Sequence, residues 1–302
     1  MTYKPQAYVH GLMLISIILA ASSFPVGAVI TNALPPEVMM FLRFFFASAL
    51  FAPYVILKHG FKIPSLKEMA RYGILSIPLV VFFWCMFESL RYTSVLNAGA
   101  LYTTVPAITA ILAFLINGET SEKMRSTGLF IGTFGALWIV FRGSIDAFVG
   151  LDLNYGDLVF FSGCVFLSFY NPLVKRFHRG EPSAVMTFWV LLLGSLWLLI
   201  GSGKGIFNIQ WFEIESKVYG GIAYLTVFST LVTFFLLHYC TVRLGATKTS
   251  AYGFLTPVFI VVLSILLGME EFEMMLAPGL LMIMSAMFMI QLDGRSRVEN
   301  NL

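Results

Sequence analysis

The charged side chains that fall inside long apolar stretches are the first candidates for chemistry in this sequence. Two full charges do so, Arg43 and Glu88. Arg43 lies eight residues after Pro35, where its stretch begins, and therefore about 12 Å along a helix from that end. Glu88 lies six residues before Ser94, near the end of the next stretch, about 9 Å from the same face. We therefore expect Arg43 and Glu88 to approach each other.

An ionised pair at this depth has two interpretations. Intramembrane charge is costly, and so it is a functional hypothesis by default. In that case the pair holds the carboxylate and the amine of a zwitterionic solute, or exchanges a proton. Alternatively, Arg43 and Glu88 form a buried ion pair that only locks two helices together. The sequence leaves both interpretations open.

His238 is the histidine that falls inside an apolar stretch. Imidazole gains and loses a proton near neutral pH, which suits a proton carrier. The alternative is a residue at the inner end of a helix that extends its polar ring to the membrane surface. Glu88 and His238 are therefore the two proton-coupling candidates.

Aromatic and amide side chains inside the stretches are candidates to line a solute cavity. Trp84 shares a helix face with Glu88, because residues four apart lie one above the other. Each such side chain alone also fits helix–helix packing, but together they favour an amphipathic organic solute over a bare ion. With Arg43 and Glu88, the predicted substrate-binding residues are Trp84, Asn97, Tyr102, Tyr170, Asn171, Trp189, Tyr239 and Tyr252.

The composition places these residues in a membrane. Of the 302 residues, 58% are hydrophobic and 12% are charged, and the mean hydropathy is +0.85. Soluble domains hold ~45–50% apolar and ~25% charged residues, so a soluble enzyme and a secreted disulfide scaffold are excluded. The net charge of +3 implies no nucleic-acid partner. The three cysteines form no CxxC pair, so neither a metal nor a cofactor is expected.

Ten apolar stretches are long enough to cross a bilayer, which takes ~20 residues in a helix. They are continuously apolar and do not alternate, which favours helices over a barrel. The sequence therefore predicts an all-α integral membrane protein with ten transmembrane helices. The predicted spans are 8–29, 35–57, 71–92, 95–116, 124–142, 155–175, 182–201, 218–240, 247–267 and 274–292.

Lys and Arg are unevenly distributed over the connecting segments. With the N-terminus placed in the cytoplasm, the inner segments hold 14 of these residues and the outer segments hold 4. Cytoplasmic loops of membrane proteins carry such an excess of basic residues. We therefore predict a multi-pass protein of the cell inner (plasma) membrane, with both termini cytoplasmic.

The second half of the chain repeats the first at an offset of 151 residues. Pro106 then meets Pro257, and Gly128 meets Gly279. Two five-helix units follow, over residues 1–146 and 150–294, with a cytoplasmic tail at 295–302. Because five is odd, the second unit enters the membrane upside down, as in the inverted repeats of many secondary transporters.

These residues belong to a longer pattern. The first half contains Leu90-Arg91-Tyr92-Thr93-Ser94, Ala98-Gly99-Ala100-Leu101, Thr104-Val105-Pro106, Gly118-Glu119 and Gly128. The second contains Arg243-Leu244-Gly245-Ala246, Ala251, Thr256-Pro257, Glu270 and Gly279. This pattern resembles the EamA-type repeat of the drug/metabolite transporter (DMT) superfamily. The resemblance implies two inverted five-helix bundles, alternating access and transport of small organic metabolites. It also implies a cavity formed mostly by spans 3, 4, 8 and 9, with spans 1, 2, 6 and 7 around them.

The repeated residues have physical interpretations of their own. A proline near mid-span removes a backbone donor and lets a helix bend, so Pro106 and Pro257 are either gating hinges or static kinks. Glu119 and Glu270 fall at span ends, where a capping or loop role is expected.

Gly128 and Gly132 form a small-residue face on the fifth span. Such a face permits close helix contact. The contact lies either within the chain or along the seam of a homodimer, so the sequence allows a monomer or a homodimer.

The predicted function is a secondary transporter that exports small organic metabolites, such as amino acids, by alternating access. The segment Gly201-Ser202-Gly203-Lys204-Gly205 lacks the Ser or Thr that a phosphate-binding loop needs after its lysine. The alternatives are a membrane channel or facilitator and, more remotely, a membrane-embedded enzyme, for which the sequence offers no catalytic motif. The expected partners are a small organic solute, the lipid bilayer and, if transport is coupled, protons.

Overall fold

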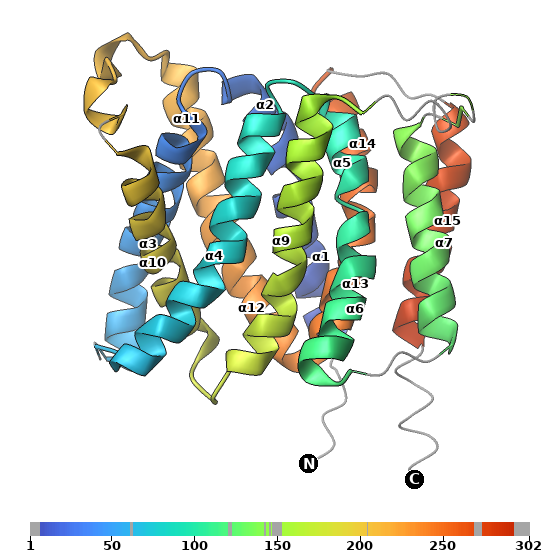
Figure 1. Ribbon diagram of the computed structural model, residues 1–302, viewed down its shortest axis with the longest axis horizontal. Helices are drawn as coiled ribbons and strands as arrows, with labels where there is room; N and C mark the ends of the chain where they lie inside the picture. The colour runs from blue at the N-terminus through green and yellow to red at the C-terminus, as the bar shows by residue number, and fades with distance from the viewer. Residues whose placement is uncertain are drawn as a thin grey trace.

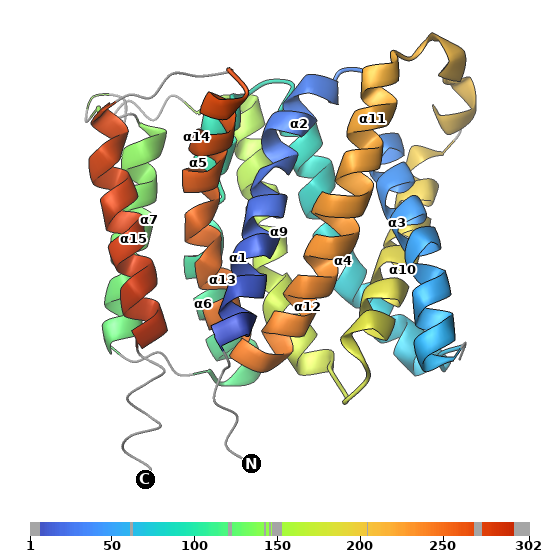
Figure 2. The same cartoon turned by 180° about the vertical axis from the view of Figure 1, so that it is seen from behind.

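The computed structural model describes residues 7–60, 63–119, 123–141, 143–144, 146, 153–203, 205–268 and 274–292. Within these residues the chain forms helices and no β-strand. The long helices run from one face of a bundle to the other (Figure 1). The same arrangement is seen from behind in Figure 2.

The first half of the chain supplies five spans, the first and fourth of which are each built from two helices. Their bounds are α1 (Ala7–Ala21) with α2 (Ser23–Ile30), α3 (Pro36–His59), α4 (Leu66–Ser89), α5 (Val95–Leu101) with α6 (Thr104–Asn117), and α7 (Lys123–Val140).

The second half supplies the other five spans. The sixth and seventh are α9 (Tyr155–Phe177) and α10 (Ser183–Ser202), followed by the short turns η1 (Gly205–Asn208) and η2 (Trp211–Glu213). The eighth joins α11 (Ser216–Tyr224), the π-helix η3 (Leu225–Val232) and α12 (Thr233–Leu244). The ninth joins α13 (Ala246–Ala251), η4 (Tyr252–Leu255) and α14 (Thr256–Leu266), and η5 (Met274–Leu276) precedes α15 (Ala277–Leu292), the tenth.

The described helices match the predicted spans in number and order. Eight are long and apolar enough to cross a membrane, and two shorter apolar helices, Thr127–Ile139 and Met274–Met289, lie in the fifth and tenth spans. The prediction of an all-α membrane protein with ten transmembrane helices in two inverted five-helix repeats is confirmed.

Helix packing follows the exchange that an inverted repeat requires. Each span of the first half corresponds to the span five places later in the second half. The corresponding helices are therefore α1 and α9, α3 and α10, and α4 and α12. The α4–α9 contact accordingly has its counterpart in α12–α1, and the α6–α9 contact has its counterpart in α14–α1. The pairs α3–α10 and α7–α15 map onto themselves, and both are packed. This pattern is what a two-fold axis between the halves produces.

Glycine brings the fifth and tenth spans into close contact. A Cβ atom on Gly279 of α15 would lie 2.6 Å from the carbonyl oxygen of Gly135 on α7 and 2.7 Å from Cγ1 of Ile139. The two backbones can approach so closely only because glycine has no side chain. A Cβ on Gly132 would lie 3.0 Å from the ring of Phe254. Gly132 therefore serves a contact within the chain.

Contacts between helix ends show that successive spans cross the bundle in alternating directions. At one face, the Glu119 carboxylate after α6 accepts hydrogen bonds from Lys175 of α9 and Thr247 of α13. At the other face, the Thr93 hydroxyl after α4 donates to Asp157 at the start of α9. The first described helix begins, and the last one ends, at the Glu119 face (Figure 1, Figure 2). The cytoplasmic location of this face stays a prediction.

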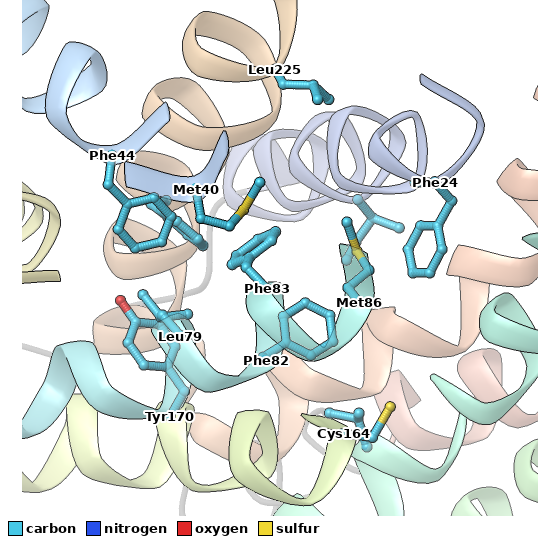
Figure 3. Packing of buried hydrophobic residues seen from close by; sticks show 14 of the residues in the cluster. Phe24, Met40, Phe44, Leu79, Phe82, Phe83, Met86, Cys164, Tyr170 and Leu225 are labelled. Atoms are coloured by element: carbon cyan, nitrogen blue, oxygen red, sulfur yellow. The ribbon is translucent and has the colours of Figure 1, made fainter. Parts of the chain in front are cut away.

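Buried phenylalanine side chains form an aromatic wall across the interior of the bundle. Figure 3 shows Phe82 and Phe83 of α4 in the middle, between Phe44 of α3 on one side and Phe24 of α2 on the other. The Phe44, Phe83 and Phe234 rings meet edge to face, with centroids 5.7 to 6.1 Å apart. Such pairs are favourable beyond the area that they bury.

Candidate solute site

A cavity of about 60 Å³ lies between the two halves of the bundle. Spans 1, 3, 4, 6, 8 and 9 all contribute to its wall, and none of its lining residues comes from spans 2 and 7 among the described residues. The wall of the cavity therefore includes spans 1 and 6 in addition to the four expected spans, which are 3, 4, 8 and 9. The polar side chains of the lining are the hydroxyl residues Ser16, Ser23, Tyr102, Ser229, Thr233 and Thr256.

Most of these hydroxyl groups donate their proton to the backbone. Ser16 donates to the carbonyl oxygen of Thr233 at 3.2 Å, and Ser229 donates to that of Leu19 at 2.7 Å. Thr233 itself donates to the carbonyl oxygen of Phe228 at 3.0 Å. Their oxygen lone pairs are left for other donors. The lining can therefore accept hydrogen bonds from a solute without breaking any bond of the protein.

Thr256 differs from the other hydroxyl residues of the lining. Its Oγ1 atom is buried and has no hydrogen-bond partner. A buried hydroxyl without a partner costs free energy, and so it calls for an explanation. Thr256 is the first residue of α14 and lines the cavity. Its hydroxyl is therefore available to a solute.

Both halves interrupt a helix where it reaches the cavity. In the fourth span α5 ends at Leu101 and α6 begins at Thr104, and in the ninth η4 separates α13 from α14. Pro106 and Pro257 lie in the first turn of α6 and α14, where a missing N–H leaves no hydrogen bond unmade. In each span the break lies in the turn that precedes the proline, so Pro106 and Pro257 stand at the start of a new helical segment. The hinge role of Pro106 and Pro257 stays a prediction.

Arg43 is completely buried in α3, with 0% of its surface exposed. Its Nε and Nη2 atoms donate to the Thr230 hydroxyl oxygen at 3.2 and 2.9 Å, and Nη1 donates to the Met40 sulfur at 3.6 Å. The guanidinium carbon lies 5.0 Å from the ring centroid of Phe83 and 5.3 Å from that of Phe87. Within the described part of the chain, no carboxylate pairs with Arg43.

Glu88 lies elsewhere, so the expected Arg43–Glu88 pair does not form. Its carboxylate meets Arg91 of the same segment at 3.4 Å, in a polar groove of about 450 Å³ that Trp84 and Glu37 also line. Trp84 donates from Nε1 to the Glu37 carboxylate at 3.3 Å. Trp84 and Glu88 do share a face, as predicted. Successive helix residues are about 100° apart, so when α4 turns Phe87 toward Arg43 it turns Glu88 away.

His238 is also completely buried, and it joins three spans. Its Nδ1 lies 2.6 Å from Oγ1 of Thr187, and its Nε2 is hydrogen-bonded to the Tyr170 hydroxyl. Thr187 donates its own proton to the Ser183 carbonyl oxygen at 2.8 Å, so it accepts from Nδ1–H, and Nε2 accepts from Tyr170. The interpretation of His238 as a surface-reaching residue is therefore wrong. Its role as a proton carrier stays a prediction.

Tyr102 is the predicted substrate-binding residue that lines the cavity. Its ring packs edge to face on Phe24 and tilted on Phe82, with centroids 6.0 and 5.9 Å away. It therefore forms part of the aromatic surface that a solute would meet.

The other predicted binding residues are dispersed through the bundle. Asn171 accepts a hydrogen bond from a threonine of α12, and the Tyr252 hydroxyl is hydrogen-bonded to a histidine of α1. The Tyr239 ring lies against the guanidinium of an arginine one turn along α12. Trp189 is buried in α10, and Asn97 is partly buried in α5. Their part in binding stays a prediction.

The serine and threonine residues of the lining were missed, although the sequence carries a signal for those of the eighth span. Thr226, Ser229, Thr230 and Thr233 follow the spacing of one helix face, in a stretch that is otherwise apolar. Small polar residues at membrane depth commonly bond across helices. Ser229 and Thr233 line the cavity and Thr230 binds Arg43.

The Glu119 carboxylate ties three spans together at one face of the bundle. It accepts from Lys175 Nζ at 2.7 Å and from Thr247 Oγ1 at 2.6 Å. Burial alone would raise the pKa of this carboxyl, but the hydrogen bonds from Lys175 and Thr247 outweigh it and lower the pKa below its usual value of 4.5. The expected structural role of Glu119 agrees with this geometry, while Glu270 lies outside the described residues.

Glu119→Gln is expected to lower stability at pH 7 and to change its pH dependence. A depressed carboxyl pKa stabilises the fold above about pH 4.5, and this contribution is lost as the pH falls through the lower folded-state pKa. We expect a loss of about 1–3 kcal/mol at pH 7. Melting curves of wild type and variant should differ at pH 7 and converge in acid.

Glu215→Gln is the matched control, because its partner Lys217 and the carboxylate itself are both exposed. This variant should melt within about 1 °C of wild type, since exposed ion pairs add little stability. A Glu119→Gln protein that melted like the control at pH 7 would contradict the role of the Glu119 contacts.

Comparison with known proteins agrees with this architecture. The profile of the EamA-like transporter family matches the chain twice, over residues 8–141 and 154–292. The uncharacterized transporter YyaM of Bacillus subtilis is 28% identical over 228 residues, which cover 75% of each chain. An uncharacterized transporter of Archaeoglobus fulgidus is 24% identical over 83% of this chain and 86% of its own.

A solved crystal structure shares the fold. It superposes with a TM-score of 0.72 at 16% identity and covers 95% of this chain and 98% of its own. The two family matches coincide with the two halves that exchange their helix contacts. The chain is therefore a multi-pass membrane protein that belongs to the EamA-like transporter family.

Proposed function

We propose that the protein is a secondary transporter that moves a small organic solute by alternating access, with the cavity between its halves as the solute site. The observation that carries this proposal is that both halves line one small cavity, through Tyr102 and Phe82 from the first and Ser229 and Thr256 from the second. Rocking of two inverted repeats exposes such a midplane site to each side in turn.

The size of the cavity supports a site that opens and closes. Its volume is about 60 Å³, whereas sites for small organic ligands usually measure ~300–1,000 Å³. The halves must therefore separate before a solute can enter. We propose that the units 1–146 and 150–294 move against each other, with the interruptions beside Pro106 and Pro257 as hinges. The Glu119 contacts would close one face.

The finer features of the transport cycle are also part of this proposal. The solute class is small organic metabolites such as amino acids, and the direction is export from the cell across its inner membrane. The resemblance of the repeats to DMT transporters supports the solute class, and the direction is proposed without further support. Proton coupling, if it occurs, would use Glu88 or His238. The N-terminus and the tail at 295–302 would be cytoplasmic; both lie outside the described residues.

The test is counterflow in liposomes that contain the purified protein. The panel consists of amino acids and nucleoside-like metabolites, each offered against an excess of the same unlabelled compound. We expect saturable flux that an excess on the opposite side accelerates. Flux that rises linearly with concentration and carries an ion current would instead indicate a channel, and no exchange of any panel member would contradict the proposal.

A further inference from the structure

Arg43 is a buried charge without a counter-charge. Its guanidinium is 0% exposed and contacts a hydroxyl, a thioether and two phenyl rings. Desolvation of a charge costs several kcal/mol, and one hydroxyl group repays only part of it. Elsewhere in the described part of the chain, Glu119 and Glu88 each have a basic partner. The acid that would balance Arg43 is therefore not supplied by the described protein.

Phe83 belongs both to the cavity lining and to the surroundings of Arg43. Phe83 lines the cavity, and the centroid of its ring lies 5.0 Å from the guanidinium carbon of Arg43. Figure 3 shows Phe83 at the centre of the aromatic wall. Thr230, which holds the guanidinium, directly follows the cavity residue Ser229 in the π-helix η3. A rotation of the Phe83 side chain would therefore bring the cavity and the cation into contact.

Most of the serine and threonine hydroxyls of the lining can only accept hydrogen bonds, but two other features of the lining fit a carboxylate better than a cationic group. Among the described residues, the lining contains no Asp or Glu to pair with an amine. It does contain Thr256, whose buried hydroxyl has no partner and can donate to an anion. The aromatic wall, with Phe24 and Tyr102, fits an apolar body attached to the charged group.

We infer that the transported solute carries a carboxylate on an apolar, ring-sized body, and that Arg43 is the counter-charge of this carboxylate once Phe83 moves aside. This inference rests on the proposed transport function and adds the charge class of the solute. A neutral solute would leave Arg43 uncompensated, and a cationic solute would be repelled by it. A zwitterion meets the requirement through its carboxylate.

The test compares four compounds that share a phenyl ring and differ in charge. They are phenylacetate (anion), phenylalanine (zwitterion), 2-phenylethanol (neutral) and 2-phenylethylamine (cation). Binding to the full-length protein is measured by the ligand-dependent shift of its melting temperature. We expect phenylacetate and phenylalanine to bind roughly 10- to 100-fold more tightly than the alcohol, the advantage of a hydrogen-bonded charge, and the amine to bind no better than the alcohol.

Variants then assign the preference to Arg43. Arg43→Gln should bind phenylacetate no better than 2-phenylethanol, while Arg43→Lys, which keeps the charge, should retain part of the preference. Arg91→Gln removes an arginine of the polar groove that Glu88 and Trp84 line and should leave the preference intact. Equal binding of acid and alcohol by wild type, no binding of the acid, or an unchanged preference in Arg43→Gln would overturn the inference.

Failure of this inference can be told apart from failure of the transport proposal. The wild-type comparison needs no variant to fold, so it decides the charge class by itself. Counterflow of a neutral or cationic metabolite would sustain the transport function and reject the carboxylate. Absence of counterflow for every compound would reject transport, whatever binds.

Discussion

Arg43→Met is expected to abolish transport without loss of stability. We expect counterflow of any solute that wild type accepts to fall about 100-fold, because the charge that binds the solute is gone. The melting temperature should stay the same or rise. Replacing a buried charge by an apolar side chain of similar size is often neutral or stabilising by about 1–4 kcal/mol.

The measurement pairs counterflow with thermal unfolding. The cysteines Cys85, Cys164 and Cys240 are all buried, so a thiol-reactive dye reports unfolding without further labelling. Arg43→Met leaves the Thr230 hydroxyl without its hydrogen-bond donor. The double variant Arg43→Met with Thr230→Val removes this hydroxyl as well, which should increase stability further.

Arg91→Met is the control for a structural arginine. Arg91 pairs with Glu88 and donates to the carbonyl oxygens of Thr31 and Leu34 at 3.2 and 2.9 Å. Its removal leaves these acceptors short of a donor and should cost about 1–3 kcal/mol. If Arg43→Met lost stability to the same extent as Arg91→Met, Arg43 would be a structural residue, as the alternative interpretation of the sequence holds.

Gly279→Val is expected to give the largest loss of stability among single glycine variants. Its Cβ would fall 2.6 Å from the Gly135 carbonyl oxygen, and a backbone atom cannot rotate away. Overpacking of this kind typically costs 1–3 kcal/mol, so we expect about that loss or more. The melting temperature should fall by several degrees, because α7 and α15 are forced apart.

Gly220→Val supplies the matched control. Gly220 lies within α11, and a Cβ there would meet no atom within 4 Å. Its replacement should leave the melting temperature close to that of wild type. Equal melting temperatures for Gly279→Val and Gly220→Val would show that the close approach of α7 and α15 does not contribute to stability.

The sequence predicted the helices better than it predicted their contacts. Apolar runs determine where spans occur, and the paired prolines Pro106 and Pro257 revealed the repeat. Apolar length does not determine helix rotation, however. A turn of about 100° per residue decided that Phe87 faces Arg43 and Glu88 faces the polar groove.

Local helix geometry was also beyond the reach of the sequence. Pro106 and Pro257 marked a bend in the fourth and ninth spans but did not show that the helices are interrupted there, and no residue pattern pointed to the π-helix η3. The interruptions and η3 are also the places where Ser229, Tyr102 and Thr256 line the cavity. For this reason most of the predicted aromatic and amide binding residues lie outside the cavity, and its serine and threonine residues were missed.

The central claim is that one cavity opens to each side of the membrane in turn, and two-sided labelling of that cavity tests it most directly. Ser229→Cys is placed in a background in which Cys85, Cys164 and Cys240 are alanine, and membrane-impermeant maleimide is added from either side. The account predicts labelling from both sides. When the Glu119 face is closed by a cross-link between Glu119→Cys and Thr247→Cys, labelling should persist only from the opposite side. Labelling of Ser229→Cys from one side alone without the cross-link, or from both sides with it, would contradict alternating access.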